Sequence, residues 1–89
     1  MIRMRDVRFA YPHGGFSLQV GAYRDRSNAE TKRKLLADRG HAASVHQLQR
    51  HGRPFFCVLV GAFPSRDQAR EFRNTQESDP DLRLSDVVP

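Results

Sequence analysis

Apolar and polar residues alternate in two stretches of this chain that are spaced by 40 residues. Residues 16–23 read FSLQVGAY and residues 56–63 read FCVLVGAF. Strict alternation is typical of a strand with one buried face, and a helix-start signal follows each stretch within a few residues. The pattern therefore predicts a duplicated half-domain, in which each copy is a strand that leads into a helix.

The order of the predicted elements is βαββαβ. We expect strands at residues 16–23, 41–49, 55–63 and 82–88, helices at 27–39 and 65–76, a turn at 50–54 and a loop at 77–81. Because crossover connections are right-handed, this order gives a four-stranded antiparallel sheet with two helices on one face. The predicted class is α+β, ferredoxin-like or RNP-like, with residues 16–89 as one domain and residues 1–15 as an N-terminal tail or linker.

The predicted first helix carries a narrow apolar stripe. Ala29, Leu35 and Leu36 are expected to face the sheet, and Gly40 is expected to end the helix in the left-handed conformation. Lys32 stands where a further apolar residue is expected, and its alkyl stem can cover the gap. A helix this polar is suited to packing on a sheet with one side only.

The helix-free face of the predicted sheet is unusually apolar. Residues expected to point toward it are Ser17 and Gln19 in the first strand, Ser44, His46 and Leu48 in the second, and Phe55, Cys57 and Leu59 in the third. Phe55, Cys57 and Leu59 are more apolar than is expected of a solvent-exposed surface that contacts no partner. Gln19 is the first candidate for contact with a ligand, although a polar side chain on a half-buried strand has a purely structural explanation as well.

Composition adds a preference for acidic partners. The 89 residues suffice for one modest core, and the net charge is +5 with a pI near 10.3. A basic solvated surface without any ligand accounts for this charge equally well. No apolar run reaches the roughly 18 residues of a membrane span, and the N-terminus lacks the apolar segment of a secretory signal.

Catalytic and metal-binding patterns are weak in this sequence. His41, His46 and His51 follow at intervals of five, which puts neighbours on opposite faces of an extended strand and does not gather them around a metal. Cys57 has no evident base partner, and no pair of carboxylates stands out. We therefore expect no catalysis by this chain, no metal and no cofactor.

The repeated residues resemble the SPOR domain, the sporulation-related repeat. The resemblance is carried by QVGAY at 19–23, Asn28-Ala29 at a helix start, VGAF at 60–63 and SRDQA at 65–69, and it extends from residue 16 to about 88. It implies a non-catalytic module that binds septal peptidoglycan and prefers glycan strands denuded of stem peptides. It also implies a place in the cell envelope, in the periplasm or wall at the division septum, with roles in cell division, sporulation or wall remodelling.

The resemblance also suggests which residues contact the ligand. Gln19 matches the strand-one glutamine of the family, and Phe55 lies where members often place an aromatic residue for stacking on a sugar. The full set of expected ligand contacts is Gln19, Phe55, Ser17, Leu59, Cys57, His46 and Arg53. A denuded strand has a lactyl carboxylate on each muramic acid, so it is a polyanion suited to a basic groove.

Two other functions fit the same architecture. One is RNA binding as in RNA-recognition motifs, but RPFFCVLV matches the required aromatic motif only in part, and Gln19 stands where a stacking aromatic is needed. The other is a protein-interaction or dimerisation domain that uses Phe55, Cys57 and Leu59. Since the sequence shows no export signal, either the chain is a fragment of a larger envelope protein that is exported or anchored, or the resemblance was inherited without the function.

Overall fold

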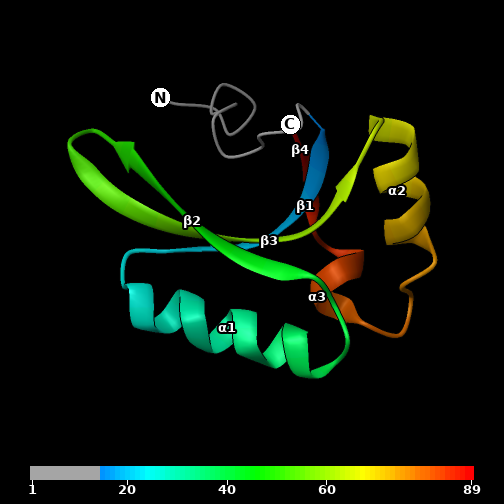
Figure 1. The fold of residues 1–89 in the computed structure, drawn as a ribbon, viewed down its shortest axis with the longest axis horizontal. Coiled ribbons are helices and arrows are strands. Elements are labelled where there is room, and N and C mark those ends of the chain that lie inside the picture. The colour runs from blue at the N-terminus through cyan, green and yellow to red at the C-terminus, as the bar shows by residue number, and fades with distance from the viewer. Residues whose placement is uncertain (1–14) are drawn as a thin grey trace.

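The computed structural model describes residues 15–89, so the tail predicted for residues 1–15 lies, except for Gly15, outside the described residues. The elements are β1 (Phe16–Tyr23), α1 (Arg26–Asp38), β2 (Ala43–Arg50), β3 (Arg53–Phe63), α2 (Arg66–Asn74), α3 (Pro80–Arg83) and β4 (Asp86–Val88). The strands form one antiparallel sheet in the order β2-β3-β1-β4 (Figure 1). This arrangement confirms the predicted α+β, ferredoxin-like class.

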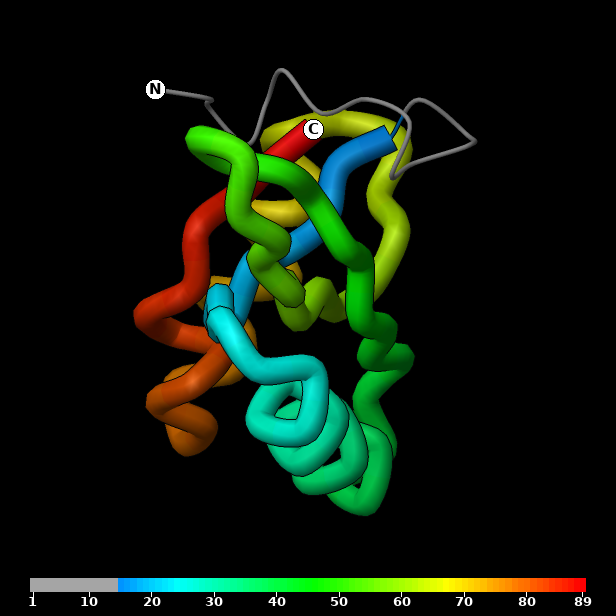
Figure 2. The backbone as a smooth tube through the Cα atoms, turned by 90° about the vertical axis from the view of Figure 1, so that its left-hand side faces the viewer, coloured from blue at the N-terminus to red at the C-terminus, as the bar shows by residue number. Residues whose placement is uncertain are grey.

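The core lies between the sheet and its helices. Ala29 and Leu36 of α1, Ala69 of α2 and Leu82 of α3 join one buried cluster with β1 and β3, so the three helices share one side of the sheet. Figure 2 shows α1 below the strands. Among residues 15–89, no helix is both long and apolar enough to span a membrane.

The stripe of α1 differs from the prediction at one position. Ala29 and Leu36 are fully buried, but Leu35 is 44% exposed. Successive helix positions are turned by about 100° from each other, so the narrow contact that α1 makes with the sheet buries only one of two adjacent leucines. Lys32, which stands at the position where an apolar residue was expected, forms an ion pair through its ammonium group with Asp81 of α3.

The sequence repeat is also a structural repeat. The guanidinium of Arg26 lies 4.9 Å from the ring centre of Phe56, and that of Arg66, its equivalent, lies 5.1 Å from the ring centre of Phe16. Each half of the chain thus covers an aromatic ring of the other half with its own arginine, a cation–π contact. Since the two halves cover each other in this way, we expect them to fold together and not singly.

The C-terminal segment was predicted in part incorrectly. The expected strand at 82–88 is only three residues long, Asp86–Val88, and α3 occupies the end of the expected loop at 77–81. The Asp79 side chain accepts a hydrogen bond from the Asp81 amide at 3.1 Å, and Pro80 lies in the first turn, which is the usual start of a helix. This short helix buries Leu82 completely.

Candidate ligand-binding site

The sheet face opposite the helices, here called the outer face, gathers most of the predicted contact residues. Cross-strand pairs on this face are Gln19 with Leu59, His46 with Cys57, and Leu48 with Phe55. These pairs connect β1, β3 and β2 side by side, so the alternation read from the sequence assigned the residues to the correct face. Their exposure, however, divides them into two groups.

The first group is the buried floor of the outer face. Leu48, Cys57, Leu59 and Val88 form a second apolar cluster and are between 1% and 7% exposed. Ser17 is 2% exposed, and its hydroxyl donates a hydrogen bond of 2.6 Å to the Gly61 carbonyl. Three predicted contacts, Ser17, Cys57 and Leu59, therefore have almost no surface to offer a ligand in this structure.

The second group is accessible. Gln19, His46 and Phe55 are half-buried, and Arg53 is exposed. A half-buried amide such as that of Gln19 can both donate and accept hydrogen bonds. The accessible group therefore combines an amide, an imidazole, an aromatic ring and a cation on one side of the sheet.

Burial controls the protonation of two groups on this face. It lowers the pKa of His46, whose Nε2 lies 2.9 Å from the Ser44 hydroxyl, and it raises the pKa of the Cys57 thiol. At neutral pH His46 is therefore an uncharged hydrogen-bonding group, and Cys57 is a protonated thiol with little nucleophilic character. Neither group adds charge to the face.

The β2–β3 hairpin places positive charge at one end of this face. Its turn was expected to span residues 50–54 but consists of two residues, His51 (φ 52°) and Gly52 (φ 73°). Positive φ at both central positions is typical of a type I′ turn, whose twist matches that of the flanking strands. The tight turn makes Arg50 and Arg53 direct cross-strand partners.

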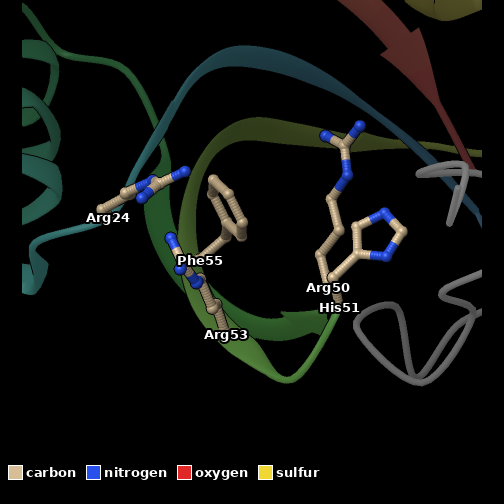
Figure 3. A pocket seen from close by; sticks show the side chains of 5 residues that line it. All are labelled: Arg24, Arg50, His51, Arg53 and Phe55. Atoms are coloured by element: carbon tan, nitrogen blue, oxygen red, sulfur yellow. The ribbon is translucent and has the colours of Figure 1, made fainter.

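A pocket of 530 Å³ lies beside this turn. Its lining is Arg24, Arg50, His51, Arg53 and Phe55 (Figure 3). The guanidinium carbons of Arg24 and Arg50 lie 5.6 Å and 6.0 Å from the ring centre of Phe55, on either side of the ring in the view of Figure 3. The pocket is therefore an aromatic ring with basic side chains around it.

Sequence reasoning identified Arg53 and Phe55 of this pocket but missed Arg24, Arg50 and His51. Arg24 directly follows β1, and the register that pairs Tyr23 with Phe56 brings it opposite Phe55. Arg50 pairs with Arg53 because the turn between them has only two residues. Recognition of Arg50 as a partner of Arg53 requires the strand register as well as the turn residues.

No acidic side chain among residues 15–89 neutralises the charges of the pocket. Within residues 15–89, no carboxylate forms an ion pair with Arg24, Arg50 or Arg53; the ion pairs of that part of the chain lie on α1, α2, α3 and the residues beside them. In the same part of the chain no three histidine, cysteine or acidic side chains gather in a group that could hold a metal ion. The pocket is thus suited to an anion.

Comparison with known proteins agrees with this fold. The family model of the SPOR domain matches residues 12–76. The solution structure of the peptidoglycan-binding domain of the B. subtilis cell wall lytic enzyme CwlC is similar, with a TM-score of 0.56 and 21% identity over 81% of this chain and 86% of that one. No curated protein sequence matches the chain significantly. Because the family model matches well over half of its residues, this chain belongs to the SPOR domain family.

Proposed function

We propose that this chain binds peptidoglycan through its outer face and serves as a non-catalytic targeting module. The observation that carries the proposal is that the SPOR match at residues 12–76 includes β1, β2, β3 and the hairpin, which together build this face. The similar CwlC domain is itself described as peptidoglycan-binding. A wall hydrolase joined to such a module would be brought to its substrate.

The chemistry of the outer face suits a glycan. N-acetyl groups need a donor and an acceptor together, which the half-buried amide of Gln19 supplies. His46 offers a neutral hydrogen-bonding ring on β2, and Arg53 offers a charge at the end of the face. We assign direct contact to Gln19, His46 and Arg53, a place at the basic end of the face to Phe55, and a supporting role to the buried Ser17, Cys57 and Leu59.

We further propose that denuded glycan strands are preferred. A stem peptide is attached through the lactyl carboxylate of muramic acid, so its removal frees one negative charge per disaccharide and takes away bulk. Both changes favour binding to a sheet face with a basic end. A domain with this preference would act in the cell envelope where stem peptides are removed, such as the septum during cell division, and in sporulation or wall remodelling.

Co-sedimentation with isolated sacculi tests this function. We expect the domain to be retained more strongly on amidase-treated sacculi than on intact ones. Loss of the hydrogen bonds of one amide in Gln19→Ala should weaken retention by about three- to tenfold. Gln49→Ala is the matched control, because Gln49 is an exposed glutamine on strand β2, outside the predicted contacts.

The same assay distinguishes the alternatives. Absence of retention on both wall preparations would contradict the proposal. Binding of single-stranded RNA that weakens with salt, without retention on the wall, would favour the RNA-recognition function, for which the basic pocket around Phe55 is the relevant feature. Self-association without either ligand would favour the dimerisation module.

A further inference from the structure

We infer that Arg24, Arg50 and Arg53 form an anion subsite that takes a carboxylate of the glycan, and that Phe55 positions two of the three guanidinium groups. This inference rests on the proposed function and makes it more specific. It assigns the preference for denuded strands to particular residues of this chain. It also gives Phe55 a role other than the sugar stacking expected from the sequence.

The arrangement of the arginines is electrostatically unfavourable without a ligand. Arg50 and Arg53 face each other across the two strands next to the turn, and like charges directly opposite each other destabilise a hairpin. Arg24 adds a third positive charge to the same pocket. An anion bound between these groups would convert this repulsion into attraction.

Another pocket, at the C-terminal end of α1, shows the contrasting case. It is lined by Arg39, His41 and Asp79 among others, and its charged groups satisfy one another. Arg39 lies 3.2 Å and His41 lies 3.3 Å from the Asp79 carboxylate. That cluster is explained by its structural role at the end of α1, whereas the arginines beside the hairpin have no acidic partner among the described residues.

The position of Phe55 explains how the arginines are held. Arg24 and Arg50 both lie within cation–π distance of its ring, at 5.6 Å and 6.0 Å (Figure 3). A sugar stacked on the ring would have to displace one of these guanidinium groups. Long, exposed arginine side chains lose much conformational freedom when they bind, and a ring that orders them beforehand reduces this cost.

The place of the pocket on the sheet identifies the ligand group. Phe55 and Leu59 are on the same face of β3, and Leu59 is the cross-strand partner of Gln19, so a glycan lying along β3 would pass from Gln19 to the arginines. The planar guanidinium fork matches a carboxylate in two parallel hydrogen bonds. On a denuded strand the available carboxylate is the lactyl group, while on an intact strand carboxylates occur in the stem peptide.

A pair of ligands that differ only in charge tests the subsite. The probes are a denuded glycan oligomer and the same oligomer with its lactyl carboxylates converted to methyl esters, with affinity measured by calorimetry at several salt concentrations. We expect the ester to bind about tenfold more weakly and with a smaller salt dependence, because it lacks the charge that the arginines contact. Equal affinity for the two oligomers would overturn the inference and leave the proposed function standing, whereas failure of both to bind would contradict the proposed function itself.

Substitution of the arginines connects the charge effect to this pocket. Arg24→Gln, Arg50→Gln and Arg53→Gln should each weaken binding of the charged oligomer by about three- to tenfold and leave the ester unaffected. Arg70→Gln on α2 is the matched control for net charge, since Arg70 is exposed and outside the pocket. Because Arg53→Gln removes one of two facing charges, its melting temperature should equal or exceed that of the wild type, which separates loss of binding from loss of folding.

Two further measurements test whether the bound carboxylate is the lactyl group and whether Phe55 positions the arginines. Free stem peptide should fail to compete with the charged oligomer, and competition by it at equal concentration would overturn the lactyl assignment. Phe55→Leu should weaken binding of the charged oligomer more than that of the ester, because it releases the guanidinium groups. An equal loss for both oligomers would show sugar stacking and overturn the positioning role.

Discussion

Gly21 and Gly61 hold equivalent places in the two halves of the chain and have similar neighbours, but only Gly61 has a positive φ. A Cβ atom on either glycine would lie 2.7 Å from the aromatic ring two residues later, Tyr23 or Phe63. Only Gly61 combines this close approach with a positive φ of 76°, where side chains are strained. Gly40 has a positive φ of 89° with open space around it, so it shows the backbone effect alone.

The stability losses caused by alanine at these three glycines should be additive. We expect Gly61→Ala to lower the free energy of unfolding by about the sum of the losses in Gly21→Ala and Gly40→Ala, and to exceed Gly21→Ala by about 1–2 kcal/mol, the cost of the left-handed backbone. Urea denaturation of the three variants measures this. Equal losses in Gly21→Ala and Gly61→Ala would show that the backbone conformation contributes nothing.

At the scale of elements, ion pairs connect α3, near the C-terminal end of the chain, to α1. Lys32 and Arg39 of the α1 segment both form ion pairs with Asp81, and Arg39 also reaches Asp79. The hydrogen bond from Lys32 is the largest cause that lowers the pKa of Asp81, and Arg39 adds to it, while burial opposes them. Since the native state favours the ionised carboxylate, Asp81 stabilises the fold above its ordinary pKa, and this contribution is lost as the pH falls through its lowered value.

Replacement of Asp81 by asparagine should therefore have an effect that depends on pH. At pH 7 we expect Asp81→Asn to lower the free energy of unfolding by about 1 kcal/mol, a modest value because both side chains remain partly exposed. The difference from wild type should shrink as the pH falls below the ordinary pKa of an aspartate, since wild-type Asp81 then becomes neutral as well. Thermal unfolding between pH 3 and pH 7 measures it, with Asp86→Asn on β4 as the control; a constant difference across this range would rule out the ion pair as the cause.

The helices and strands were predictable to different degrees. The apolar spacing of the repeat predicted β1, β3, α1 and α2 to within two residues at each end, because each long element has several periodic positions. The four-residue α3 has too few positions for any period to appear, although Asp79 and Pro80 carried its start signal. The turn between β2 and β3 was predicted too long because Arg50, Arg53 and Pro54 were assigned to the turn instead of the strands.

At the scale of the whole molecule, the two faces of the sheet differ in composition and charge. The helical face builds the core and carries the ion pairs of α1, α2 and α3, whereas the outer face has an apolar floor and a basic pocket at one end. Alternation predicted which residues point to the outer face but not which of them are buried there. The two-residue period of a strand determines the face to which a side chain points, whereas its burial depends on the neighbouring side chains. Ser17, Cys57 and Leu59 were therefore predicted as contacts although they are buried, and Arg24 and Arg50 were missed because alternation does not give the register between strands.

An amide chemical-shift map of the ¹⁵N-labelled domain, titrated with a denuded glycan oligomer, tests most directly whether the outer face is the binding site. We expect the shifted amides to form one continuous patch that includes Gln19 on β1, Phe55 on β3 and the hairpin at residues 50–53, with α1 and α2 unchanged. Shifts that gather on the helical face, or a bound oligomer that leaves Gln19 and the hairpin unshifted, would contradict binding through the outer face.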